Sequence, residues 1–330
     1  MSARRRGVAL TPMETRHDII LDTAQLADEL GYEAFALPEG WGLDATLVLT
    51  EAASRTRGIR LVTGILSVWG RTPGTLAMTA ATLHRLSGGR FVLGLGPSTR
   101  ALVEGFHDVR FTHPADRLRE VTAKVRALLE GERAPLDGAS GARPLRLGQT
   151  AVPDLPIWLA AMGDRTTRVA AELADGWFPV LMARDQVADR APRLRRDREA
   201  AGLRSKPITV VAGPLTVAAD DPALAHRISS SCLAWYLCAM GDVYARSLTG
   251  QGYGSAVQVI LEANPHPRPD AGVVPTGAQV VLDEFTVNGT PCQVRDQLAG
   301  WDAAVDLTMV GLPPGLPWDV IETTLRAAAP

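Results

Sequence analysis

Short apolar runs alternate with longer helical segments along this 330-residue chain, and this alternation constrains the fold more than any other feature. The apolar runs are typical of strands buried on both faces, because hydrophobic residues fill them almost without interruption. Between them, apolar side chains recur every three or four residues, which is the spacing of amphipathic helices. The eight predicted strands are residues 7–12, 33–39, 59–68, 91–95, 156–161, 177–182, 208–217 and 307–312.

Strands that each precede a helix run parallel and are joined by right-handed crossovers. An open doubly wound sheet and a closed (β/α)8 barrel both satisfy this rule. Eight units in one continuous series favour the barrel, and a barrel of about 250 residues with insertions accounts for the length. We therefore predict an α/β fold, a (β/α)8 TIM barrel with insertions, as a single domain over residues 1–330. Residues 223–263 are predicted to be wholly helical, longer than one crossover requires.

Composition argues against several classes of function. Hydrophobic residues make up 46% of the chain and charged residues 21%, as in ordinary globular proteins. The formal net charge of -2 does not indicate a nucleic-acid surface, and no apolar stretch reaches the roughly 18 residues of a membrane helix. The basic residues 4–6 resemble a twin-arginine signal, but the apolar run that follows them is too short for one. We expect a cytoplasmic protein that binds a small molecule, and neither nucleic acid nor membrane.

Neither the cysteines nor the histidines are spaced to bind a metal. The three cysteines, Cys232, Cys238 and Cys292, contain no C-x-x-C pair, and their odd number argues against a disulfide framework. The six histidines show no H-E-x-x-H or related spacing. We expect free thiols and no metal site.

In a barrel of this kind, active residues lie where strands end and the following loops begin. This rule selects a mouth rich in glycine, small residues and tryptophan, without a Ser-His-Asp set or a facing pair of carboxylates. Such a mouth suits a flat ring lying close to the backbone, and a bound cofactor usually carries the chemistry when the protein offers little of its own. The selected residues are 11–12, 39–41, 64–69, 96–98, 161–163, 179–182 and 311.

Two glycine-containing segments suggest phosphate binding. Residues 94–99 resemble a dinucleotide loop, but the third glycine is missing and no helix is predicted directly afterwards, so we do not adopt that interpretation. Gly163 precedes a helix predicted to begin near Asp164, and the amides at a helix start favour phosphate. Capping of the helix by Asp164 is the alternative, and the sequence leaves both open.

Long segments of the chain resemble the luciferase-like flavin and deazaflavin oxidoreductases. The most specific is RTRGIRLVTGILSVWGRTPGTLAMTAATLHRLSGGRFVLGLGPS, residues 55–98. Residues 102–132, LVEGFHDVRFTHPADRLREVTAKVRALLEGE, and 156–180, PIWLAAMGDRTTRVAAELADGWFPV, are similar to the coenzyme F-420-dependent branch, which includes methylenetetrahydromethanopterin reductase. The later segments LAWYLCAMG and TVNGTPCQVRDQL also fit that branch.

The resemblance implies that coenzyme F-420 lies across the mouth of the barrel and that a hydride is transferred at carbon 5 of its deazaflavin ring. The substrate would be a small organic molecule, reduced at a C=C or C=N bond or oxidised as an alcohol, with secondary metabolism as one setting. Two alternatives stay open, a monooxygenase that uses reduced FMN and oxygen, and a flavin-binding barrel without catalysis. A homodimer is also implied.

The resemblance further supplies cofactor-binding positions. Gly64 and Ile65 match a non-prolyl cis peptide packed behind the ring. Arg184 is the nearest candidate cation for a tail phosphate, with a solvated arginine at a helix start as the alternative. The full set is Glu39, Gly64, Ile65, Gly96, Pro97, Ser98, Ala160, Ala161, Met162, Gly163 and Arg184.

Glu39, Glu104 and His107 are the candidate catalytic acids and bases. For Glu39 the alternative is a surface carboxylate at a loop start, and for His107 a structural loop histidine. Trp41 and Trp69 are either walls of a substrate-binding site or ordinary packing residues.

The sequence departs from the family in two places. Gly40 stands where a histidine or another polar residue often follows the acid, which excludes a role for histidine there. Residues 254–276 are rich in proline where the family has a helical run, and this leaves the substrate preference open.

Overall fold

The first strand pairs with the last, and this pairing closes the sheet. β1 (Arg6–Ala9) runs parallel to β11 (Leu307–Gly311) on one side and to β2 (Ala34–Leu37) on the other. The computed structural model describes residues 4–136, 138, 141–266, 268 and 270–330. Within it, the remaining strands of the closed sheet are β3 (Arg60–Thr63), β5 (Phe91–Gly96), β6 (Ile157–Leu159), β7 (Gly176–Trp177) and β8 (Thr209–Ala212). All the pairings around this sheet are parallel, so the predicted (β/α)8 barrel is confirmed.

Side chains alternate between the barrel interior and the helical layer, because successive residues of a strand point to opposite faces. In β2, Ala34 and Ala36 face an interior cluster that also contains Trp158 and Met309. Phe35 points the other way and packs in the layer between strands and helices. Small residues on one strand beside large ones on another fill the interior of such a barrel.

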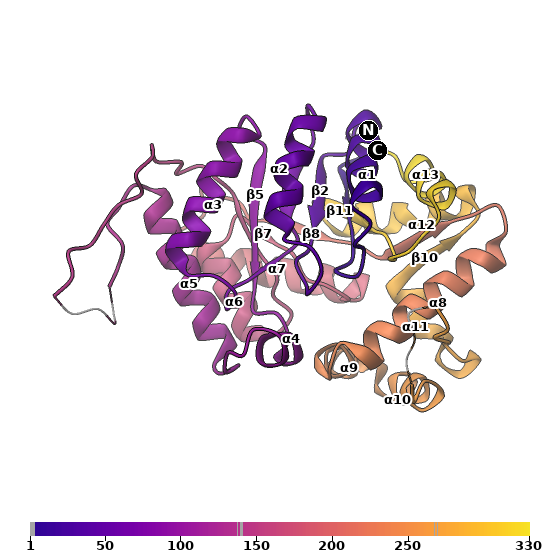
Figure 1. The fold of residues 1–330 in the computed structure, drawn as a ribbon. Coiled ribbons are helices and arrows are strands. Elements are labelled where there is room, and N and C mark those ends of the chain that lie inside the picture. The colour runs from indigo at the N-terminus through magenta and orange to yellow at the C-terminus, as the bar shows by residue number, and fades with distance from the viewer. Residues whose placement is uncertain (1–3, 137, 139–140, 267, 269) are drawn as a thin grey trace.

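The outer layer consists of helices whose apolar faces cover the strands (Figure 1). Three of them begin at side-chain caps, where Asp44, Thr72 and Thr290 accept hydrogen bonds from the amides of Thr46, Thr75 and Gln293. The layer contains α1 (His17–Glu29), α2 (Ala45–Arg55), α3 (Pro73–Leu86), α5 (Pro114–Leu129), α6 (Asp164–Leu173), α7 (Arg184–Ala200), α12 (Pro291–Ala304) and α13 (Trp318–Ala327).

Two predicted strands are interrupted, and one further strand is not evident from the sequence. The run 59–68 forms β3 and β4 (Leu66–Ser67), which the peptide between Gly64 and Ile65 separates. The run 208–217 forms β8 and β9 (Leu215–Ala218). β10 (Thr286–Gly289) pairs with β9 outside the closed ring. Its sequence, TVNG, lacks the apolar run that marks the other strands, so it resembles a loop.

A helical segment between β9 and β10 lies at the lower right in Figure 1, and most residues of a second apolar cluster come from it. The expectation of one unbroken helix over residues 223–263 is wrong, because Gly241 takes a φ of 75° and separates two helices. Residues 254–263 of the proline-rich region are helical. The segment contains α8 (Pro222–Ala239), α9 (Val243–Leu248), η1 (Thr249–Tyr253), α10 (Gly254–Ala263), η2 (Thr276–Ala278) and α11 (Gln279–Phe285).

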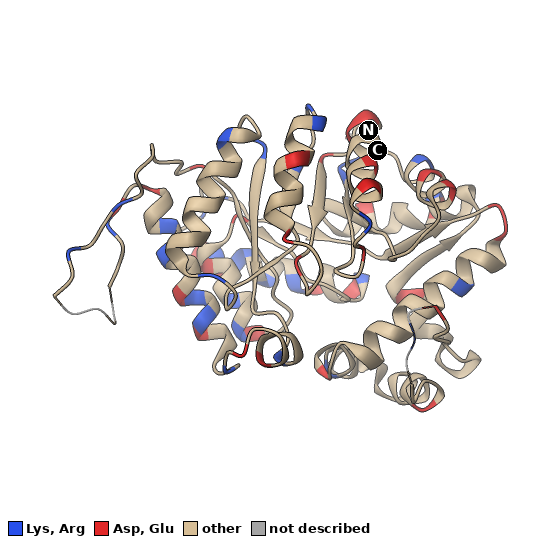
Figure 2. Ribbon diagram, viewed as in Figure 1, with Lys and Arg blue, Asp and Glu red and all other residues tan. Residues whose placement is uncertain are grey.

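Charged side chains of both signs are interspersed on the outer helices, and the strands are mostly free of them (Figure 2). Among the helices that the structure describes, none is both long enough and apolar enough to cross a membrane.

Arg6 is a fully buried charge in β1, where the barrel closes, whereas Arg60 at the start of β3 is exposed. Its guanidinium donates to both carboxylate oxygens of Asp302, at 2.6 and 3.1 Å, and to the carbonyl of Ala328 at 3.0 Å. Asp302 also accepts a hydrogen bond from the Thr308 hydroxyl at 2.8 Å. One charge therefore connects β1 with β11, α12 and the end of α13. The preceding Arg5 pairs with Glu33 at the surface, so Arg5 and Arg6 of the basic run at residues 4–6 both have partners in the fold.

We predict that Arg6→Gln lowers the free energy of unfolding by about 3–5 kcal/mol, because it leaves Asp302 without its partner at a largely buried position. Arg5→Gln is the matched control and should cost less than about 1 kcal/mol, since its pair is exposed. Urea denaturation followed by circular dichroism measures both. Equal losses in the two variants would contradict the role assigned to Arg6.

Candidate active site

A cavity of about 420 Å³ lies at the carboxyl ends of the strands, between the barrel and the helical segment that follows β9. Leu102 of α4 (Arg100–Gly105) lines one side, and Tyr244 and Arg246 of α9 line the other. Figure 1 shows α4 and α9 at the same end of the barrel. This is the end at which barrel geometry places active residues.

Most of the residues predicted for the mouth come together at this cavity. The predicted residues that line it are Glu39, Trp41, Gly64, Ile65, Pro97, Ser98, Ala160, Met162 and Gly163. Those that do not line it are Gly96, Ala161, Trp69, Glu104, His107 and Arg184.

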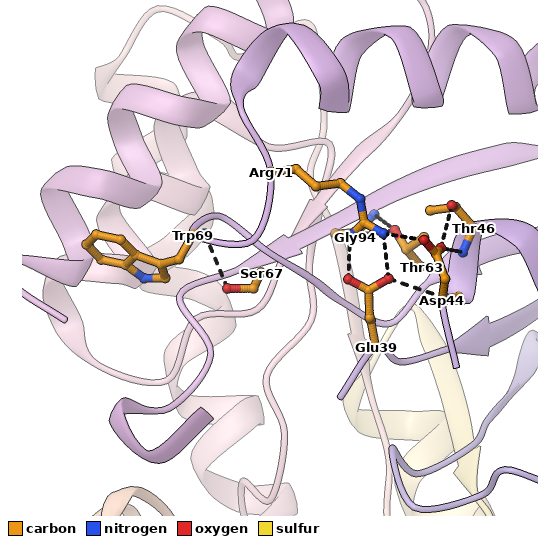
Figure 3. A network of polar contacts seen from close by, with 9 residues as sticks. Glu39, Asp44, Thr46, Thr63, Ser67, Trp69, Arg71 and Gly94 are labelled. Carbon is orange, nitrogen blue, oxygen red and sulfur yellow. Dashed lines mark hydrogen bonds and ion pairs between the residues drawn. The ribbon is translucent and has the colours of Figure 1, made fainter. Parts of the chain in front are cut away.

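Glu39 is paired with Arg71, a residue that sequence reasoning missed (Figure 3). Both oxygens of the carboxylate accept from the guanidinium, and Oε2 also accepts from the amide of Ala45 at 3.3 Å. The two side chains are 13% and 16% exposed, so the pair is largely desolvated. Glu39 is therefore neither unpaired nor a surface carboxylate, because an ionised group at this depth requires a partner.

Arg71 also holds Asp44, which fixes the start of α2. Its guanidinium donates to Asp44 at 2.9 Å, and Asp44 accepts from the amide and hydroxyl of Thr46 at 2.9 and 2.6 Å. Burial opposes ionisation of Asp44, but these bonds and the charge of Arg71 lower the pKa of its carboxyl. The hydrogen bond to Glu39 raises the pKa of Arg71. One arginine thus orients two carboxylates.

The predicted cis peptide between Gly64 and Ile65 is confirmed. The carbonyl of Ile65 accepts from the amide of Glu39 at 3.2 Å, which ties this turn to the end of β2. Gly96 lies behind it, where a Cβ atom would come within 3.0 Å of the Ile65 side chain and 3.1 Å of the Ala160 Cβ. Gly96 therefore supports the cavity wall without lining it.

Trp69 lies one layer behind the cavity. Its indole donates to the carbonyl of Pro97 at 3.1 Å, and its ring lies 5.8 Å from Phe111 and 5.5 Å from the guanidinium of Arg117. Of Trp69 and Phe111, Phe111 is the one that lines the cavity. Figure 3 shows Trp69 well apart from Glu39, beside Ser67. Trp41, 47% exposed, lines the cavity mouth as expected.

Glu104 and His107 take part in the loop structure around α4 instead of facing the cavity. Glu104 pairs with Arg100 at 2.9 Å and accepts from the amide of Phe111 at 3.0 Å. His107 packs edge-on against Phe106, with ring centres 5.1 Å apart. Both residues are close in sequence to a strand end, but the turn of α4 carries them away from the mouth.

Arg184 points away from the cavity. Its guanidinium contacts Asp185 and lies against Gly300 of α12, and the residue lines a separate cavity of about 130 Å³. Among the described residues, Arg246 is the only lysine or arginine that lines the main cavity, and it pairs with Asp242 at 2.8 Å. Sequence position did not indicate Arg246, because it comes from the helical insertion.

Two helix starts bear on the expectations for phosphate binding: α6 begins at Asp164 as expected, whereas the helix after residues 94–99 was not expected. α6 has Gly163 as its N-cap, without a side-chain cap, so Asp164 does not fill that role. Gly163 and Thr166 line the cavity, which leaves the first amides of α6 beside it. A short helix, α4, does begin directly after residues 94–99, and the hydroxyl of Thr99 caps it. Among the described residues, no cluster of three or more possible metal ligands occurs.

Comparison with known proteins gives the family. The sequence profile of the luciferase-like monooxygenase family matches residues 2–307. The chain belongs to this family. It is 32% identical to a putative coenzyme F420-dependent oxidoreductase of Mycobacterium tuberculosis, over 86% of this chain and 87% of that protein. It is 30% identical to the phthiodiolone/phenolphthiodiolone dimycocerosates ketoreductase of Mycobacterium sp. strain JLS, over 81% of this chain and 72% of that protein.

A solved structure supports the fold independently of these sequence comparisons. The coenzyme F420-dependent tetrahydromethanopterin reductase from Methanopyrus kandleri superposes with a TM-score of 0.79 at 21% identity. The superposition covers 99% of this chain and 98% of that one. At this identity, the likeness concerns the luciferase-like barrel.

We predict that Arg71→Met lowers the free energy of unfolding by about 2–3 kcal/mol, because it leaves Glu39 desolvated without its cation. Combined with Glu39→Met, it should show a coupling energy of about 1–3 kcal/mol in a double-mutant cycle. Arg100→Met is the control, since its pair with Glu104 is exposed. Additive losses at positions 39 and 71 would show that the pair is not energetically coupled.

Proposed function

We propose that this protein is an oxidoreductase that uses coenzyme F-420 to transfer a hydride to or from a small organic substrate. The main support for this proposal is the cavity, which is lined by the backbone turn at Gly64 and Ile65 and by Gly163 at the uncapped start of α6. Few side chains in the cavity could carry out a reaction themselves, so a bound cofactor ring would supply the reactivity. The F420-dependent relative from Mycobacterium tuberculosis supports the assignment.

The residues present fit the coenzyme. Ile65 and Pro97 offer apolar surface and backbone for a flat ring, and the free amides of α6 beside Gly163 suit a phosphate. Arg246 takes the place that the sequence suggested for Arg184, as a cation for the acidic part of the cofactor. When bound, the deazaflavin would supply a hydride to the substrate, or accept one from it, at carbon 5 of its ring.

The residues of the chain position the reactants and exclude water. Phe178, Leu215 and Met309 form apolar parts of the wall, which would strengthen electrostatic contacts within the cavity. Glu39 is held by Arg71 with both oxygens engaged, so its role is to orient the ring by accepting a hydrogen bond on a remaining lone pair. A carboxylate fixed in this way is better suited to positioning than to moving a proton.

The second candidate function is a monooxygenase that uses reduced FMN, which the family name favours. Both ring systems are flat and carry a phosphate, so the described wall residues do not separate them on shape. A direct comparison of the two cofactors distinguishes the functions.

We predict that F-420 binds with a low micromolar Kd or tighter, and FMN at least about ten times more weakly, a difference of about 1.4 kcal/mol. Fluorescence titration of the purified protein with each cofactor measures this. Equal or tighter FMN binding, together with oxygen consumption by the reduced complex, would favour the monooxygenase. Absence of binding for both cofactors would contradict both functions.

Glu39→Gln separates positioning from proton transfer, because it preserves shape and removes charge. We predict that the Kd for F-420 rises about tenfold, whereas turnover at saturating cofactor changes by less than about threefold. Glu33→Gln, at the opposite end of the barrel beside Arg5, is the matched control. A fall in turnover of about 100-fold at unchanged affinity would instead make Glu39 a catalytic acid or base.

A further inference from the structure

The hydroxyl of Thr11 is buried at the wall of the main cavity and has no hydrogen-bond partner among the described residues. Thr11 follows β1 and is 5% exposed. Four other buried side-chain atoms share this lack of a partner, in His84, Thr122, Thr167 and Ser229, but none of these residues lines the cavity. Thr11 is thus set apart by its access to a ligand.

Tyr236 of α8 presents a second hydroxyl to the same place. The residue lines the cavity, and its ring packs edge-on against Trp235 and Tyr244 with centre separations of 5.7 and 5.6 Å. Burial and the neighbouring Tyr244 raise the pKa of Tyr236 well above its ordinary value, and the Thr11 hydroxyl, which is near enough to interact but does not form a hydrogen bond of normal geometry, partly offsets this. Both hydroxyls therefore keep their protons at neutral pH and can donate.

A buried hydroxyl without a partner destabilises the folded chain, and valine would fill the same volume without that cost. Such a group is explained when a ligand supplies the missing hydrogen bond. The Thr11 hydroxyl faces a cavity, so the partner arrives from the cavity side.

We propose that the hydroxyls of Thr11 and Tyr236 form an oxygen site, which binds the carbonyl oxygen of an apolar ketone or the hydroxyl of the corresponding alcohol. The proposal rests on the proposed function and names the substrate class of that site. Two donors match the two lone pairs of a carbonyl oxygen, and either hydroxyl can also accept from an alcohol. The same donors would stabilise the negative charge that develops on oxygen when a carbonyl is reduced.

The surroundings favour a neutral oxygen over a charged group. Leu215, Met240 and Met309 give the cavity wall an apolar character. A carboxylate substrate would need a cation of its own, but Arg246, the only lysine or arginine among the described residues that line the cavity, is assigned to the acidic part of the cofactor. A cationic C=N substrate would need a free carboxylate, and Arg71 engages both oxygens of Glu39. An uncharged carbonyl needs neither.

The test compares two probes of nearly equal shape, cyclohexanone and methylenecyclohexane, which differ in having or lacking the oxygen acceptor. Each is titrated into wild type, Thr11→Val and Tyr236→Phe, with oxidised F-420 bound so that no reduction occurs. Ligand-observed NMR reports the affinities. Tyr253→Phe is the matched control, because Tyr253 packs against Phe285 and does not line the cavity.

We expect each of the two variants to bind cyclohexanone about fivefold more weakly or worse, with methylenecyclohexane unaffected. Thr11→Val should also have a Tm equal to or above that of the wild type, since it removes an unpaired buried hydroxyl. A structural role for Thr11 would instead lower the Tm. A lowered Tm of Thr11→Val would overturn the proposal. So would unchanged affinity of the variants for cyclohexanone, equal losses of affinity for both probes, or failure of cyclohexanone to bind the wild type.

Failure of the proposed function is seen separately, as failure of F-420 to bind the wild type. In that case the same comparison of probes and variants on the unloaded protein still decides whether the oxygen site exists.

Discussion

The pairing of β1 with β11 is the constraint on which the rest of the structure depends. It turns a parallel sheet into a closed ring, so that every strand ends at one side of the molecule. Thr11, Glu39 and Ile65 are far apart in the sequence and meet only because their strands are neighbours in that ring. The buried charge of Arg6 lies at this closure. Desolvating an ion is costly, so its bonds to Asp302 and the Ala328 carbonyl tie the two ends of the chain together with specific geometry.

The mouth contains two polar groupings that differ in how they are satisfied. Glu39, Arg71 and Asp44 complete one another within the protein, which gives a rigid charged corner beside β2. The Thr11 hydroxyl lacks such completion and faces Tyr236 across the cavity wall. A polar network whose hydrogen bonds are complete within the protein is rigid and can orient a ligand beside it. An unpaired donor, in contrast, is stabilised only when a ligand supplies its hydrogen bond. These two corners therefore suit different tasks, positioning of a cofactor and recognition of a substrate.

The sequence predicts what is local or periodic, and misses what the fold brings together. Apolar runs predict the strands of the closed barrel, and the strand-end rule selects Thr11, Glu39 and the Gly64–Ile65 turn for the mouth. Arg71 is 32 positions from Glu39, and no spacing rule joins them. Arg246 and Tyr236 come from the insertion, whose orientation over the mouth depends on packing of its own core. β10 has too few apolar residues to be distinguished from a loop.

The barrel and the helical insertion between β9 and β10 contribute different parts of the cavity. The helices of the insertion pack around an apolar cluster that contains Leu233, Leu237 and Ile260 and also takes in Leu181 and Leu215 from the barrel, but not the interior cluster of Trp158 and Met309. The barrel contributes the turn at Ile65, the Glu39 corner and the start of α6, which are the parts suited to holding a cofactor. The insertion contributes Tyr236, Tyr244 and Arg246, which close the opposite side. A change in α8 or α9 can therefore alter which substrate fits while the hydrogen bonds of the barrel remain intact. Thr11 is a barrel residue whose hydroxyl lies near Tyr236 of the insertion, so a ligand oxygen bound by both hydroxyls would join the two parts of the molecule.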